Sequence, residues 1–154
     1  MKDRADARTL DLLDDWTAPD VTVHYDGDTA PRGPDLDQRI AQAVSRTLSD
    51  DGRSREEIAE AMGAVLGHRM PKNTLDGYAA PSRGDHAISL ARAIALMEVT
   101  GDVRVVAQEL RRLGYAVIPD RYLGAVEEAM TAEQIEHLEA KRKIARRAWR
   151  GGHR

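Results

Sequence analysis

Side chains that can hydrogen-bond to the edges of DNA bases gather near the middle of the sequence. Arg69 is followed by Lys72, Asn73 and Thr74. An Arg can donate two hydrogen bonds to guanine, and an Asn can pair with adenine in the same two-bonded way. A Lys reaches phosphate oxygens, which positions a protein on the duplex without reading its sequence. These residue types in this order predict a contact surface for double-stranded DNA.

A second basic stretch closes the sequence. Residues 141–154 hold seven Lys or Arg and no acidic residue, whereas the whole chain carries a net charge of −3. The chain is therefore no general nucleic-acid coat, and any DNA contact must come from local basic surfaces. Such a tail neutralises phosphates but has no rigid frame for reading sequence, and a solvated, solubilising tail is an equal alternative. The candidate contacts in it are Lys141, Arg142, Lys143, Arg146, Arg147 and Arg150.

The stretch that must position the central donors has the pattern of two short helices and a turn. Ser54 and Glu57 have the spacing of a capping box, which starts a helix. Gly67 stands where a helix-ending glycine belongs, Pro71 suits the first turn of a second helix, and Pro81 stops that helix. Apolar residues at helical spacing give the inner faces: Ile58, Ala61, Met62, Val65, Leu66, Leu75 and Tyr78. This is the plan of a DNA-binding helix-turn-helix, and an ordinary helical hairpin is an equal alternative.

Three further helices are expected to complete a domain over residues 34–118. Asp35 caps the first, which ends near residue 50. Asp85 caps the second, from His86 to about Thr100, and the third covers about 102–113. The absence of Phe and the few aromatic residues favour an all-α fold. We expect one core made by Ile40, Val44, Ile58, Met62, Leu66, Leu75, Tyr78, Leu90, Ile94 and Leu110.

Residues 1–33 form an acidic N-terminal arm in this interpretation. Leu13 and Trp16 could anchor it on a phage or host protein, or on the domain itself, and a partly ordered tail is the alternative. Residues 21–25 are a short β-like run. They could pair with a similar run at 115–118, or that second run could pair across a dimer.

Residues 119–154 are expected to form a helical extension that ends in the basic tail. The pattern predicts one helix over 121–130, with Leu123 and Val126 facing inward, and a new capping box at Thr131 and Gln134. The last helix then carries a seam at spacings of three and four: Ile135, Leu138, Arg142, Ala145 and Trp149. This seam indicates a homodimer, or else a helix that packs back on its own domain.

Catalytic and metal-binding patterns are absent from the sequence. The five His are scattered, there is no Cys, and the acid pairs Glu56/Glu57 and Glu127/Glu128 are sequence neighbours that point in different directions on a helix. The glycines in helical context make no phosphate loop: Gly63, Gly67 and Gly77. We therefore expect no enzyme, no cofactor and no metal. With no membrane-length apolar run and an N-terminus too acidic for a signal peptide, we expect a cytoplasmic protein.

From about Leu10 onward the sequence resembles a family of small helix-turn-helix proteins encoded in the early region of Mu-like transposable phages and prophages. The resembling stretches are, in order, DLLDDW, DLDQRIAQAVSRTLSD, SREEIAEAMGAVLGHRMPKNTLDGYAAP, DHAISLARAIALMEVTGD and GYAVIPDRYLGAVE, followed by a charged helix with a basic end. The segment from Ser54 to His86 is the most specific part. The resemblance implies a DNA-binding protein of a bacterial host cell, either a transcriptional regulator or an accessory to transposition. Pro71 departs from it, because a polar N-cap is expected there.

Acidic residues beside the predicted contact surface support a second class of function. Glu56, Glu57, Glu60 and Asp76 repel phosphate. The alternative is therefore an interaction module, in which the same fold holds a protein partner without sequence-specific DNA recognition.

Overall fold

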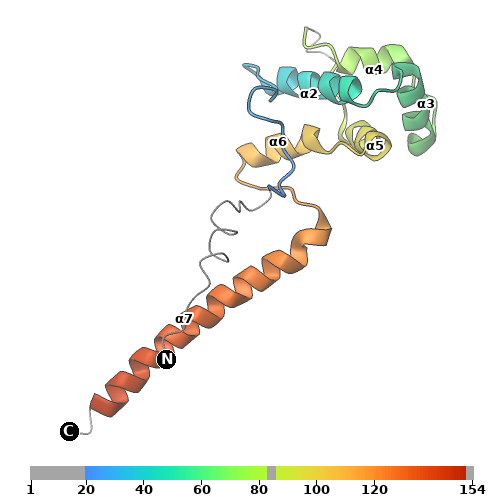
Figure 1. Cartoon of the computed structure of the whole chain (residues 1–154). Helices are drawn as coiled ribbons and strands as arrows, with labels where there is room; N and C mark the ends of the chain where they lie inside the picture. Colours follow the sequence, from blue (N-terminus) through green and yellow to red (C-terminus); the bar gives the residue numbers. More distant parts are fainter. Residues whose placement is uncertain (1–19, 83–85, 152–154) are drawn as a thin grey trace, which may run out of the picture.

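The computed structural model of the chain describes residues 20–82 and 86–151. Within these ranges the fold is all-α, as predicted, and no strand occurs in them. The helices are α2 (Leu36–Asp50), α3 (Arg55–Leu66), α4 (Lys72–Tyr78), α5 (Leu90–Thr100), α6 (Arg104–Arg112) and α7 (Leu123–Gly151), with a 3-10 turn η1 (Asp120–Tyr122) before α7. Helices α2 to α6 pack into one helical domain, and α7 projects from it (Figure 1).

The predicted capping signals set the ends of α3. The Ser54 hydroxyl accepts the backbone N–H of Glu57, and the Glu57 carboxylate accepts the backbone N–H of Ser54 at 2.8 Å. Gly67 ends the helix in the left-handed conformation, with φ of 72°, which a glycine adopts without a steric penalty. One expectation was wrong in detail: Pro71 is the N-cap of α4 rather than a residue of its first turn, since its ψ of 142° is extended.

The core confirms half of the residues expected in it. Those buried as predicted are Val44, Ile58, Met62, Leu75 and Tyr78. Ile40 and Leu66 pack against them in half-buried positions, and Leu110 is half-buried.

Leu90 and Ile94 were wrongly placed in the core, because they are 70% and 49% exposed. Helix α5 begins at Leu90 after the N-cap Ser89, not at His86, and Asp85 lies outside the described residues. The face of α5 that packs on the domain is made by Ala93, Ala95 and Leu96. Small alanines allow a close approach of two helices, and Leu96 fills the remainder of this face, so Leu90 and Ile94 are left on the outer side of α5.

The two β-like runs lie side by side but form no strand. The backbone N–H of Val23 donates to the carbonyl of Val117 at 2.8 Å. Tyr25, in the stretch expected to be an arm, is buried in the domain core. The segment from residue 20 onward therefore packs on the helices.

Helix α7 is one continuous helix of 29 residues, so the predicted break at Thr131 was wrong. The Thr131 hydroxyl donates to the carbonyl of Glu127 at 2.7 Å, one turn earlier, which satisfies the side chain inside a helix. Leu123 and Val126 are exposed rather than inward-facing. None of the described residues of α7 is buried, and its main contact among the described elements is with η1. It therefore does not pack back on the domain.

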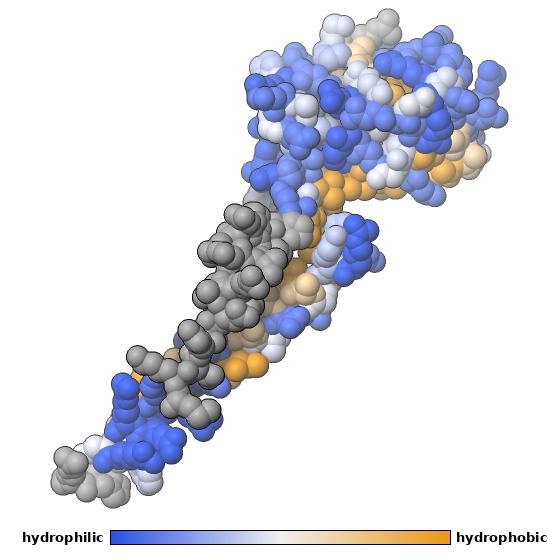
Figure 2. All heavy atoms as spheres, in the orientation of Figure 1, coloured by the Kyte–Doolittle hydropathy of each residue, from blue (hydrophilic) through white to orange (hydrophobic). Residues whose placement is uncertain are grey.

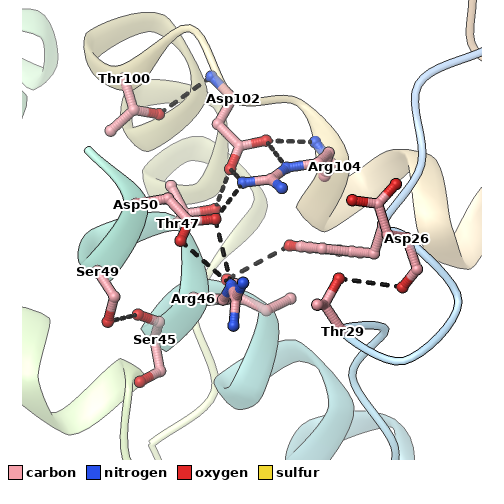
Figure 3. Close-up of polar contacts among 12 residues, drawn as sticks. Asp26, Thr29, Ser45, Arg46, Thr47, Ser49, Asp50, Thr100, Asp102 and Arg104 are labelled. Carbon is pink, nitrogen blue, oxygen red and sulfur yellow. Dashed lines mark hydrogen bonds and ion pairs between the residues drawn. The ribbon is translucent and has the colours of Figure 1, made fainter.

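A polar cluster joins the N-terminal segment, α2 and the turn between α5 and α6 (Figure 3). The buried Thr47 donates from Oγ1 to Asp102 Oδ2 at 2.7 Å. Arg104 donates to both carboxylate oxygens of Asp102, at 2.9 and 2.8 Å, and to Asp50 Oδ2 at 2.7 Å. Its guanidinium carbon lies 4.7 Å from the centre of the Tyr25 ring, within range of a cation–π interaction. The cluster thus ties three separate segments together.

The surroundings of Asp102 and Tyr25 shift the pKa values of both side chains. Burial by itself would raise the pKa of Asp102, but the hydrogen bonds from Arg104 and Thr47 outweigh it and hold that pKa below its ordinary value. Burial, together with the nearby charge of Asp102, raises the pKa of Tyr25 to about 12. At neutral pH the cluster therefore contains an ionised Asp102 and a neutral Tyr25.

Replacing Asp102 by Asn is expected to lower the free energy of unfolding at pH 7 by about 1–3 kcal/mol, because it weakens the hydrogen bonds from the buried Thr47 and the part-buried Arg104. The folded-state pKa of Asp102 lies below its unfolded value, so its contribution is complete above about pH 5 and is lost as the pH falls through the folded pKa. The free energies of unfolding of wild type and Asp102→Asn, measured by denaturant melts, should therefore converge in acid. Glu136→Gln, on the exposed surface of α7, is the control. An equal difference at pH 7 and in acid would contradict this role.

Candidate nucleic-acid interface

The turn between α3 and α4 packs closely on α3 because residue 63 is a glycine. A Cβ atom at Gly63 would lie 3.1 Å from the His68 carbonyl oxygen and 3.2 Å from the Met70 nitrogen. Met70 is itself buried, which fixes the path of the chain into α4. Sequence reasoning only excluded Gly63 from a phosphate loop. The available signal was a glycine in an otherwise good helix, one turn before the helix end.

Helix α4 buries its inner face and turns its first residues outward. Leu75 and Tyr78 are buried, as predicted. Lys72 and Asn73 are exposed at the start of the helix, Thr74 is half-buried, and Arg69 is exposed in the preceding turn. The structure therefore presents three of the four predicted donors on the surface, and holds Thr74 partly inside.

Carboxylates of α3 and α4 already engage the cation at the start of α4. Lys72 Nζ lies 3.5 Å from Asp76 Oδ2 and 3.4 Å from Glu56 Oε1. Asp76 also accepts a hydrogen bond of 2.8 Å from Arg55. The charges of Asp76 and Glu56 raise the pKa of Lys72, and the hydrogen bond from Arg55 lowers the pKa of Asp76. Two cations and two anions make this cluster neutral, so Lys72 has less net attraction for a phosphate than an unpaired lysine would have.

The structure does not bring the two predicted basic sets together. The terminal set lies on the second half of α7, whereas α4 lies on the side of the domain away from the start of α7 (Figure 1). We expected the basic tail to have no rigid frame, but it is helical as far as Gly151. All six of its candidate residues are exposed: Lys141, Arg142, Lys143, Arg146, Arg147 and Arg150. Each set must therefore act on its own.

The domain has two surface hollows that the sequence did not predict. An open cavity of about 540 Å³ is bordered by Arg32, Arg111 and Arg112. Arg32 lies 3.9 Å from Asp28 and Arg112 lies 3.7 Å from Glu109, so two of the three cations have carboxylate partners. The second hollow is an apolar groove of about 310 Å³ between α2, α5 and α6. Its apolar lining includes Leu36, Ile88, Leu90, Val106, Leu110 and Leu113. Figure 2 shows apolar atoms along the lower edge of the domain, on the side that faces α7.

The remaining features considered in the sequence are metal ligands, membrane-spanning helices and the anchor residues Leu13 and Trp16. No group of three or more His, Asp or Glu side chains that could hold a metal occurs in residues 20–82 and 86–151. No helix in the same ranges is long and apolar enough to cross a membrane. Leu13 and Trp16 lie outside the described residues.

Comparisons with family models, with curated proteins and with solved structures each found no match.

Gly63→Ala is expected to lower the free energy of unfolding by about 1–2 kcal/mol. Alanine would gain roughly 0.5–1 kcal/mol in helix propensity, but its Cβ meets two backbone atoms of the turn, and such overpacking costs about 1–3 kcal/mol. Gly124→Ala is the matched control, because nothing lies within 4 Å of a Cβ there. Thermal melts of both variants measure the effect. A Gly63→Ala protein as stable as wild type would show that the turn can retreat from α3.

Proposed function

We propose that the chain is a helix-turn-helix DNA-binding protein of a Mu-like phage or prophage, a transcriptional regulator or an accessory to transposition in the host cytoplasm. The observation that carries the proposal is the arrangement of α3 and α4. The first helix is capped at both ends, the turn is held against it at Gly63, and α4 buries Leu75 while turning Asn73 outward. That arrangement supports the entry of the start of α4 into a major groove.

The side chains divide into those that would read sequence and those that would hold the backbone. Asn73 and Arg69 are exposed where the start of a recognition helix meets base edges. Lys72 would exchange its contact with Glu56 for a phosphate, since the Glu56 side chain is 64% exposed and can swing away. Because α4 has only seven residues, one copy reads few base pairs, so we propose a homodimer that binds two half-sites.

Asn73→Ala should weaken binding to a specific site and leave binding to random DNA unchanged. Loss of one bidentate base contact removes about 1–3 kcal/mol of discrimination, which is roughly a 5- to 150-fold change in the affinity ratio. Gel shifts with DNA from upstream of the gene, against a scrambled duplex of equal length, measure that ratio. Gln134→Ala on α7 is the control. Equal weakening on both duplexes, or on neither, would show that Asn73 does not read a base.

Neutralising three cations of α7 should weaken binding to any DNA rather than binding to the specific site alone. Lys143→Gln, Arg147→Gln and Arg150→Gln together keep the helix but remove three exposed charges. We expect weaker binding to specific and random DNA alike, and a salt dependence whose slope falls by about 0.9 for each lost phosphate contact. Titrations at several salt concentrations give the slope. An unchanged slope would show that α7 does not touch DNA.

The apolar groove between α2, α5 and α6 favours a second candidate, an interaction module that receives an amphipathic helix of a partner protein. Its lining is apolar apart from Glu109, which suits an apolar helix face. A folded protein that binds neither specific nor random DNA at low salt would support this candidate over the first. DNA binding that depends on Asn73 would argue against it.

A further inference from the structure

Helix α7 carries an apolar face that its own domain does not cover. Met130, Ile135, Leu138 and Ile144 are between 53% and 67% exposed. With 3.6 residues per turn, these residues and Leu123 lie within one half of the helix circumference. Most helical stability in proteins comes from packing of such a face. A long helix that buries none of its described residues is therefore suited to a partner.

The charges of α7 are divided along its length. The first half carries acids and no Lys or Arg: Glu127, Glu128, Glu133, Glu136 and Glu139. The second half carries bases and no acid: Lys141, Arg142, Lys143, Arg146, Arg147 and Arg150. The helix therefore has an acidic half next to the domain and a basic half away from it. A partner for this surface needs an apolar stripe and the reverse order of charge.

We propose that the α7 helices of two copies of the chain pair side by side in antiparallel orientation. A second α7, turned end to end, presents the required apolar stripe with its basic half against the acidic half of the first. A parallel pair would instead place like charges together along its whole length, which is destabilising. In an antiparallel pair centred on His137, Glu128 lies level with Arg146 of the other copy, and Met130 lies level with Ile144. Charge thus selects the orientation, and apolar burial supplies the attraction.

The antiparallel pair places the two helical domains at opposite ends of a rod. At a rise of about 1.5 Å per residue, 29 residues span about 43 Å. Lys143 and Arg150 lie on the side of α7 away from its apolar face, so pairing leaves them exposed. On the proposed function, the rod would separate two half-sites; this consequence rests on DNA binding, whereas the pairing itself does not.

Distances between labels on the full chain test the orientation. The chain has no Cys, so Glu136→Cys and Arg150→Cys each provide one site for a spin label. In the antiparallel pair two labels at 136 are nearly level, whereas two labels at 150 are about 39 Å apart along the axis. In a parallel pair both sites give the same short separation. We expect the distance at 150 to exceed that at 136 by well over 10 Å, and equal distances would overturn the proposal.

Light scattering at micromolar concentration tests the pairing. We expect a dimer whose dissociation constant rises at least tenfold in Leu138→Glu, which places a charge in the apolar face, and stays within twofold in Glu136→Gln, on the opposite side. Leu138 is exposed in one chain, so the variant domain should fold, and circular dichroism checks this. A wild-type monomer, or a dimer that Leu138→Glu leaves unchanged, would overturn the proposal. A dimer that binds no DNA would overturn only the proposed function.

Discussion

The carboxylate of Asp102 is the constraint on which the rest of the domain depends. A part-buried charge is tolerated only when its oxygens are hydrogen-bonded, and here Thr47 of α2 and Arg104 of α6 supply the donors. These bonds set where α2 lies relative to the turn between α5 and α6. Since Arg104 also covers the Tyr25 ring, the N-terminal segment is held by the same cluster. One ionised side chain thus positions three stretches that are distant in sequence.

Helices α3 and α4 are held in place indirectly, through the elements that this cluster orients. Helix α5 packs along α3, and Arg53, just before α3, donates to the Val99 carbonyl of α5 at 2.7 Å. Arg39 of α2 binds Glu109 of α6 through two hydrogen bonds of 3.1 and 2.9 Å, with both side chains mostly buried. Helix α4 therefore rests on a frame of neighbours, into whose core it buries Leu75 and Tyr78. This explains how seven residues can form a defined surface.

Features set by neighbouring residues in the chain were predictable from sequence, and features set by the packing of distant segments were not. The capping box at Ser54 and the glycine at 67 act within a few residues, so the pattern contains all the information they need. The outward position of Ile94 depends on how closely the alanines of α5 approach α3. The pairing of Lys72 with Glu56 depends on how α3 and α4 cross. The sequence therefore predicted a lysine free to bind phosphate, whereas in the structure Lys72 is ion-paired. The surface position of Asn73 was predictable because Leu75 fixed the inner face of α4.

The near-neutral surface at α4 has a consequence for any DNA affinity. Because Lys72 and Arg55 are balanced by Glu56 and Asp76, one domain has little net attraction for phosphate. A single weak domain gains occupancy when a second is tethered to it, since the second binding event becomes intramolecular. On the proposed pairing and the proposed DNA binding, helix α7 would join two copies and so complement a weak reading surface. A flexible linker would dilute that gain by widening the range of separations. The proposed helix pair would instead hold the two domains at one distance, and the spacing of the half-sites would become part of the recognition.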